Sequence, residues 1–306
     1  MDSYNVIIIG GGPAGLAAGL YTSRAGLSSL LLEQGGFGGQ MVDATIHNYP
    51  GFPDGISGVE LGSLMQDQAG KYGLDTKFTE VTELNPGSPH TVVTTNGTFE
   101  ADTVIVAGGS QHRKLDVKGE SELLGRGVSY CATCDGFFFR DRVVAVNGGG
   151  DTAITDALEL TRHASKVYII HRREELRAGQ VLQKAVFANP KIEILWNKVV
   201  DEIMGDEAVK QLKLRDVKTG EILMLDVGGI FVAVGVMPTT QWLRGVVNID
   251  DDGYIVTDHD LATSIPGIFA AGDIRKNSPR QVVTAAGDGA TAGIAAFKYI
   301  QEHKVA

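Results

Sequence analysis

The sequence predicts an α/β protein made of two Rossmann-like dinucleotide-binding domains, one of which is inserted into the other. Three observations lead to this fold class. A strand, glycine turn, helix and strand follow one another from Val6, a second unit of the same kind begins at Val143, and the C-terminal segment has no glycine turn of its own. Two such units at domain spacing form an internal repeat, which sets the architecture.

The first unit comprises an apolar strand at 6–9, the glycine turn 10–15, a small-residue helix at 16–24 and an apolar strand at 30–32. In such a unit the glycines allow the tight turn, the approach of a pyrophosphate and close helix–strand packing, and free N–H groups face the anion. A glycine-rich turn without a ligand is the alternative, which the flanking elements disfavour. We expect pyrophosphate contacts from Gly10, Gly12, Pro13, Ala14 and Gly15, and a ribose contact from Glu33.

The second unit repeats this order with a strand at 143–146, a turn at 148–153, a helix at 154–163 and a strand at 167–170. Basic residues replace the acid that ends the corresponding strand of the first unit. Because guanidinium groups bind a 2′-phosphate that an acid would repel, this unit predicts NADP rather than NAD. A solvated basic strand end is the alternative. The expected binding residues are Gly148, Gly150, Asp151, Thr152, Ala153, His171, Arg172, Arg173 and Arg177.

The remaining segments complete the two sheets. Buried-type strands at 103–107 and 230–234 would close them, and alternating residues at 91–95 and 211–215 predict antiparallel hairpins. An apolar strand followed by Gly272 and Asp273, and a last helix at 284–302, would return to the first domain. Crossovers are expected near 113–119 and 242–247. The predicted domains are residues 1–113 and 244–306 for the first and 114–243 for the inserted one.

Both cysteines of the chain lie in one local motif, Cys131-Ala-Thr-Cys134-Asp135. Two thiols at this spacing at a helix start can close a small disulfide, and a helix N-terminus favours the thiolate. A zinc site would need further ligands from scattered histidines, and a pair of inert core thiols is a second alternative. Asp135 could donate a proton to a leaving thiolate, or it could simply cap a turn. We expect a redox pair and no metal.

Two dinucleotide-binding units beside a redox pair predict an electron relay. A nicotinamide releases two electrons as hydride and a disulfide accepts two, and a flavin can exchange with both. The net charge of −10 disfavours nucleic-acid binding. No apolar run approaches the roughly 18 residues of a membrane helix, and two cysteines are too few for a secreted disulfide scaffold. We therefore expect a cytoplasmic protein.

With these motifs the chain resembles the low-molecular-weight thioredoxin reductases over essentially its full length. The string Cys-Ala-Thr-Cys-Asp-Gly-Phe-Phe at 131–138 is the most specific match. The other matches are residues 10–15, 38–40, 48–51, 148–153, 171–173 with Arg177, 272–273 and 280–281. Asn147, Thr155, Asp156, Val282 and the glycines at 108–109 depart from the family's usual pattern, which leaves the nicotinamide and flavin contacts less defined than the class.

The resemblance implies an NADPH-dependent, FAD-containing reductase of thioredoxin or a thioredoxin-like protein, acting as a homodimer. It places FAD in the first domain and NADPH in the inserted one. Cys134 would be the sulfur nearest the flavin, Cys131 its partner and Asp135 the acid, and the NADPH domain would rotate between half-reactions. The further FAD contacts that it implies are Gln40, Asn48, Val81, Gly272, Asp273, Arg280, Gln281 and Val282. A flavin dithiol oxidase and a redox-sensing regulator are the alternatives.

Overall fold

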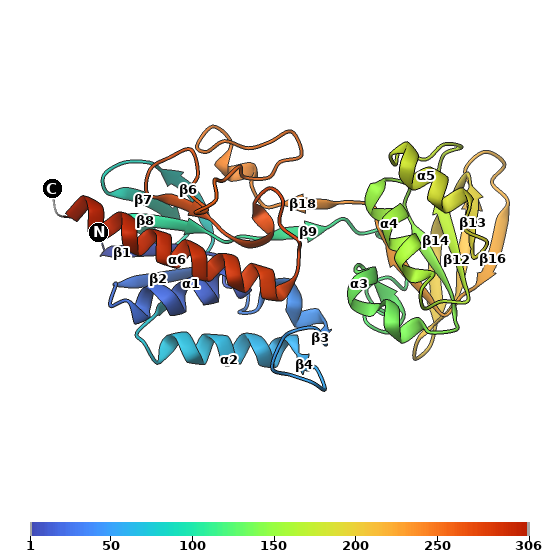
Figure 1. Ribbon diagram of the computed structural model, residues 1–306, viewed down its shortest axis with the longest axis horizontal. Helices are drawn as coiled ribbons and strands as arrows, with labels where there is room; N and C mark the ends of the chain where they lie inside the picture. The colour runs from blue at the N-terminus through green and yellow to red at the C-terminus, as the bar shows by residue number, and fades with distance from the viewer. Residues whose placement is uncertain (1, 305–306) are drawn as a thin grey trace. The chain divides into compact units, whose positions relative to one another are not determined.

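The computed structural model describes residues 2–304 (Figure 1), which divide into two units. The first contains the described residues up to Gln111 and those from Met237 on, and the second is His112–Val236. The chain enters the second unit at β9 (Ser110–His112) and leaves it at β18 (Val236–Pro238), and these strands pair with each other. The expected second crossover at 242–247 lies inside the first unit, where the apolar side chain of Leu243 is fully buried in the core.

The sheet of the first unit has the order β5-β2-β1-β8-β7-β6, and β19 pairs with β8. The parallel part contains β1 (Asp2–Ile9), β2 (Ser29–Glu33), β5 (Asp75–Phe78), β8 (Gly97–Val106) and β19 (Ile268–Ala270). The predicted hairpin is formed by β6 (Val81–Asn85) and β7 (His90–Thr94), which pair in antiparallel fashion and join the sheet through β8. Since β19 pairs with β8, the prediction that the tail completes the first unit is confirmed.

Alternate residues of β1 belong to two cores, as a parallel strand covered on both faces requires. Val6 and Ile8 face the first core together with residues of the helices, whereas Ile7 and Ile9 belong to the second. The helices are α1 (Pro13–Arg24), α2 (Gly58–Gly70) and α6 (Val282–Lys304). Figure 1 shows α1 and α6 side by side. A Cβ on Gly289 of α6 would lie 2.0 Å from the carbonyl oxygen of Ala14, so glycine permits this close approach.

Short elements complete the first unit. They are the 3₁₀ turns η1 (Gly39–Asp43), η3 (Gln241–Leu243) and η4 (Gly272–Ile274), and the two-stranded sheet of β3 (Thr45–Ile46) and β4 (Ile56–Ser57). Over residues 2–304, no helix is both long and apolar enough to cross a membrane.

The second unit is built on a parallel sheet of order β10-β17-β11-β12-β13. Its strands are β10 (Val128–Ser129), β17 (Gly229–Val232), β11 (Val143–Asn147), β12 (Lys166–His171) and β13 (Ile192–Trp196). Its helical segments are α3 (Ala132–Asp135), η2 (Gly136–Phe139), α4 (Asp151–Leu160) and α5 (Gln180–Phe187). The predicted second hairpin lies within an antiparallel sheet of β14 (Lys198–Gly205), β15 (Val209–Asp216) and β16 (Ile222–Asp226). The predicted fold class, with two Rossmann-like units, is confirmed.

Candidate functional site

The glycine turn of the first unit leaves an open face at the start of α1. A Cβ on Gly10 would lie 2.4 Å from the carbonyl oxygen of Ala107, and one on Gly15 would lie 1.8 Å from the carbonyl oxygen of Gly10. These two glycines therefore serve close packing. A Cβ on Gly12 would instead meet only Gly39, at 3.9 Å. Gly12 caps α1 without a side-chain hydrogen bond, and no acid occupies the first turn, so the helix N-terminus suits a pyrophosphate.

Glu33 lies at the end of β2, beside the same turn. One carboxylate oxygen accepts the N–H of Gly11 at 2.6 Å and the other accepts the N–H of Gly35 at 2.7 Å. Each carboxylate oxygen has two lone pairs, so both retain capacity for a further donor. The two backbone bonds fix the orientation of the carboxylate, which is suited to a ribose hydroxyl at this edge of the sheet.

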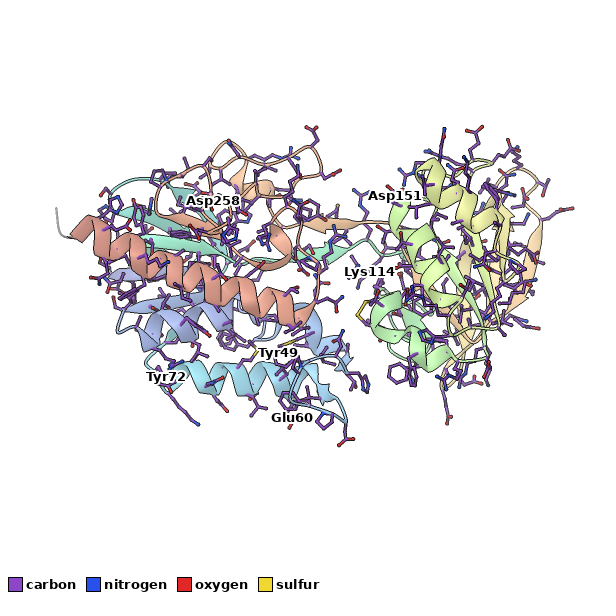
Figure 2. All side chains as sticks on the ribbon, viewed as in Figure 1. Tyr49, Glu60, Tyr72, Lys114, Asp151 and Asp258 are labelled. Carbon is purple, nitrogen blue, oxygen red and sulfur yellow. A yellow bond between two sulfur atoms is a disulfide. The ribbon has the colours of Figure 1, made fainter. Side chains whose placement is uncertain are left out.

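The turn of the second unit has the same construction. Gly150 caps α4 without a side-chain hydrogen bond, and Ala153 is fully buried beneath the turn. Asp151, labelled in Figure 2 at the start of α4, accepts the N–H of Gly179 at 2.8 Å. This bond gives its carboxylate a local structural partner. Thr152, the next residue of the first turn, is exposed. Unlike α1, α4 has an acid in its first turn, so only the backbone N–H groups of its glycine-capped N-terminus favour a pyrophosphate.

The basic cluster that begins at the last residue of β12 has one buried member and three exposed ones. His171 is buried, its Nε2 lies 3.0 Å from the carbonyl oxygen of Glu175, and its ring packs against Gly149 so closely that a Cβ there would lie 2.3 Å away. Burial, followed by the charges of Arg173, Arg177 and Arg172, lowers the pKa of His171. The three arginines are exposed. The N–H of Arg177 donates to the carbonyl oxygen of Gly149 at 2.7 Å, which ties the cluster to the turn.

Cys131 and Cys134 form a disulfide at the start of α3, drawn as a yellow bond in Figure 2. Cys131 is the N-cap residue of α3, and its Sγ accepts the N–H of Cys134 at 3.2 Å. The prediction of a disulfide at a helix start is therefore confirmed. Because the N–H of Cys134 faces this sulfur, the surroundings favour negative charge on it when the bond is reduced.

Asp135 is held by a serine that the sequence analysis did not single out. The hydroxyl of Ser129 donates to Oδ2 of Asp135 at 2.6 Å, and Ser129 Oγ accepts the N–H of Cys131 at 3.0 Å. Asp135 precedes η2 but makes no side-chain cap to it. Asp135 thus has a side-chain partner within the segment that carries the disulfide. A single serine two residues before a cysteine carries no sequence signal for this contact.

Most of the residues expected near FAD lie around η1, β3 and the start of α6, and Val81 lies apart from them in β6. Asn48 Nδ2 donates to Oε1 of Gln281 at 2.9 Å, so segments far apart in sequence meet here. Gln40 lies in η1 and is exposed, and Val81 opens β6. Val282 begins α6 and packs against an apolar cluster that includes Met41.

Asp273 and Arg280 lie on the segment between β19 and α6. Burial raises the pKa of Asp273, although Ser278 donates a hydrogen bond to its Oδ1 at 2.7 Å. Arg280 has a positive φ of 57° and donates to the hydroxyl of Tyr254 at 2.8 Å. An unusual backbone conformation beside a polar, partly buried carboxyl is typical of a site that holds a ligand.

A partly buried ion pair that the sequence analysis missed supports this segment. Arg275 donates from Nε and Nη2 to the two oxygens of Asp288, at 2.5 and 2.8 Å, and Asp288 also accepts the N–H of Gly272 at 3.0 Å. A bidentate pair of this kind fixes geometry. Its two members lie 13 residues apart, on a loop and on α6, so neither helical nor strand periodicity relates them.

The geometry agrees with the comparisons with known proteins. Residues 4–289 match the family model described as pyridine nucleotide-disulphide oxidoreductase. The chain is 48% identical over 306 residues to a thioredoxin reductase of Listeria innocua, covering 99% of this chain and 96% of the relative. Accordingly, the chain belongs to the pyridine nucleotide-disulphide oxidoreductase family, within it to the low-molecular-weight thioredoxin reductases.

Two solved structures extend this comparison. Thioredoxin reductase from Streptococcus pyogenes is 44% identical and matches with a TM-score of 0.95, covering 98% of this chain and 99% of that one. Thioredoxin reductase from Lactococcus lactis in its FR conformation is 43% identical, with a TM-score of 0.65 over 98% and 99% of the two chains. The protein is thus an oxidoreductase enzyme with the cofactors of its family, FAD and NADPH.

Proposed function

We propose that the protein is a cytoplasmic, homodimeric thioredoxin-disulfide reductase that uses NADPH and FAD. The observation that carries this proposal is the Cys131–Cys134 disulfide at the start of α3, with Asp135 in the same segment. The thioredoxin reductases among its relatives support the choice of a thioredoxin as the disulfide substrate.

We assign the cofactor contacts by unit. FAD would be held by the first glycine turn, Glu33, and the residues around η1 and the start of α6. NADPH would be held by the second glycine turn and the exposed arginines. His171 is best assigned a supporting role, because it is buried against Gly149 whereas the arginines are exposed. The assigned residues are Gly10, Gly12, Pro13, Ala14, Gly15, Glu33, Gln40, Asn48, Val81, Gly272, Asp273, Arg280, Gln281 and Val282 for FAD, and Gly148, Gly150, Asp151, Thr152, Ala153, His171, Arg172, Arg173 and Arg177 for NADPH.

When bound, FAD supplies an acceptor for the hydride of NADPH and a donor of two electrons to a disulfide. Reduction by two electrons would break the Sγ–Sγ bond of Cys131 and Cys134 and leave two thiolates, of which one takes a proton and Cys131 stays ionised as the nucleophile. Asp135 would supply one proton to a thiolate and recover it in the next half-reaction. Cys131 would then attack the thioredoxin disulfide, and Cys134 would displace the reduced thioredoxin as the enzyme disulfide re-forms. The exchange leaves one dithiol and one disulfide, as at the start.

We further propose that the second unit rotates between the two half-reactions, with the joint at β9 and β18, where the chain passes between the units. The two solved relatives support rotation. They are almost equally identical to this chain, yet their TM-scores of 0.95 and 0.65 show that they differ from each other. Such a difference is expected among proteins whose domains change their arrangement during turnover.

The test is anaerobic stopped-flow absorbance. NADPH should bleach the bound flavin, and an oxidised thioredoxin added next should restore its absorbance. The Cys134→Ser variant should still be bleached by NADPH but should lose turnover with thioredoxin, because the disulfide that receives the electrons is absent. If NADPH leaves the flavin oxidised while a reduced dithiol bleaches it, the protein is a dithiol oxidase instead. Sedimentation velocity tests the homodimer.

A further inference from the structure

Ser129 lies at the end of β10, two residues before the disulfide. Its backbone pairs with Phe231 of β17, so the strand sits at the edge of the parallel sheet. The residue is only 4% exposed. A hydroxyl buried to this degree is costly unless it is hydrogen-bonded, and its partners therefore indicate what the residue does.

The Ser129 hydroxyl has three polar atoms in reach. It accepts the N–H of Cys131 at 3.0 Å, and its single hydrogen can be donated to Asp135 Oδ2 at 2.6 Å or to the carbonyl oxygen of Cys131 at 3.4 Å. The shorter distance and the charge of a carboxylate favour donation to Asp135. One side chain thus contacts both the acid and the backbone of a redox cysteine.

We propose that Ser129 is a positioning residue that holds the carboxyl group of Asp135 for proton transfer to the cysteine pair. This inference rests on the proposed function, in which Asp135 is the acid. When Asp135 has given its proton to a thiolate, the ionised carboxylate accepts the Ser129 hydrogen. When Asp135 is protonated, its O–H can donate to Ser129 Oγ, and the serine hydrogen turns to the carbonyl oxygen of Cys131.

Serine suits this task because a hydroxyl offers one donor and two acceptor lone pairs. In the protonated state, Oγ would accept from Asp135 and from the N–H of Cys131 while donating to the Cys131 carbonyl. Every polar group of the set is then satisfied in both protonation states. An alanine at 129 would leave the carboxyl group without this anchor in either state.

The test combines Ser129→Ala, Asp135→Asn and the double variant in the full-length, FAD-loaded protein. Ser129→Ala should lower kcat for NADPH-driven thioredoxin reduction about tenfold. KM for NADPH and the rate of flavin bleaching by NADPH should stay unchanged. In the Asp135→Asn background, Ser129→Ala should have no further effect, since the group that it positions no longer transfers a proton. Ser129→Thr, which keeps the hydroxyl, should restore most of the rate.

A matched control is Ser23→Ala, which removes the hydroxyl of another buried serine; that hydroxyl has no hydrogen-bond partner within the described part of the chain. If the Ser129→Ala variant loses its flavin, kcat is compared between Ser129→Thr and Ser129→Val instead. These two side chains have nearly the same shape and differ in the hydroxyl group. A wild-type kcat in Ser129→Ala, or an equal loss in the presence and absence of Asp135, would overturn the inference. If NADPH does not bleach the flavin of the wild-type protein, the proposed function itself is overturned. That outcome is distinct because it needs no variant.

Discussion

In the proposed NADPH site, the three exposed arginines of the basic cluster would bind the nucleotide and the buried histidine would support them. His171 packs against Gly149, whereas Arg172, Arg173 and Arg177 are exposed at the turn of the second unit. A guanidinium group binds a phosphate with two parallel hydrogen bonds, and NADH lacks that phosphate. The arginines should therefore distinguish the two nucleotides, and the histidine should not.

The first prediction concerns this distinction. Replacing Arg172 and Arg173 with glutamine should raise KM for NADPH by roughly tenfold or more, because charge-assisted hydrogen bonds to the 2′-phosphate are lost. KM for NADH should change little, and kcat should be retained. Steady-state kinetics with both nucleotides measure this. Arg162→Gln, at an exposed arginine paired with Glu159, is the control. Equal effects on both nucleotides would remove the 2′-phosphate assignment.

A half-buried carboxyl on α4 gives the second prediction. Burial raises the pKa of Asp156 from 3.8 to about 6. The folded protein therefore binds this proton more tightly than the unfolded chain, and stability falls as the pH rises from about 4 to about 6. Asp156→Asn should raise the free energy of unfolding by about 1 to 2 kcal/mol at pH 8, discounted for partial exposure. The difference should shrink toward pH 5 and vanish near pH 4.

Thermal unfolding at several pH values checks this prediction. Thr155→Asn, at the exposed neighbouring position, is the control and should show no such pH dependence. A stabilisation by Asp156→Asn that is the same at pH 5 and pH 8 would show that the carboxyl group titrates normally in the folded protein.

The sequence identified those site residues that belong to motifs with a short, fixed spacing along the chain. The cysteine pair and the glycines of both turns follow such spacings, and the structure places the cysteines in the expected disulfide. Ser129, Arg275 and Asp288 could not be found in this way. Their partners are determined by tertiary packing, and serine, arginine and aspartate are common surface residues without a local pattern.

At the scale of elements, the connection that enters the second unit is tied to the strand before the disulfide. The buried carboxylate of Glu120 accepts the N–H groups of Leu115 and Asp116, at 2.9 and 2.8 Å, and the hydroxyl of Tyr130 at 2.8 Å. Burial, with the hydrogen bond to Glu120, raises the pKa of Tyr130. The ring of Tyr130 also stacks on His112 at a centroid distance of 4.9 Å. These contacts hold the connection against β10.

This network gives the third prediction. Tyr130→Phe should lower Tm by about 3 °C, because a buried carboxylate loses a donor worth about 1 kcal/mol in a unit of this size. Glu120→Ala should cost more, since it leaves two backbone N–H groups and the Tyr130 hydroxyl unpaired. Differential scanning calorimetry measures both. Tyr72→Phe, at an exposed tyrosine, is the control. An unchanged Tm in Glu120→Ala would show that the network does not stabilise the unit.

The elements next to a motif or with a continuous apolar run were predicted, whereas α2 and several of the shortest strands were not. The strands with continuous apolar runs, both helices after the glycine turns and the C-terminal helix were all predicted, with ends shifted by a few residues. The two- and three-residue strands β9, β10 and β18 were missed, because so short a segment has no periodicity and becomes a strand only through its neighbour in the sheet. Consequently the return crossover was expected too late in the chain.

At the scale of the whole molecule, the insertion of one unit into the other explains why the chain passes twice between the units, at β9 and at β18. The repeat of two glycine turns and the tail without a turn were sufficient to predict this order. The limits of the two units, and the proposed rotation, depend on the connection itself. Gly109, beside β9, has a φ of +69°, and its hypothetical Cβ meets no atom within 4 Å. Glycine is thus favoured there for its backbone freedom and not for lack of space.

Gly109 allows a test of the joint with a matched control. Gly220 lies in the turn between β15 and β16, has a φ of +78° and is equally open, so alanine imposes a similar strain at both positions. If the connection must change conformation during turnover, Gly109→Ala should lower kcat with thioredoxin several-fold at unchanged flavin content, while Gly220→Ala should lower only Tm. Stopped-flow traces of flavin reduction and reoxidation would locate the slowed step. If Gly109→Ala and Gly220→Ala had equal kcat values, backbone strain at Gly109 would have no specific effect on turnover. The joint would then lie elsewhere.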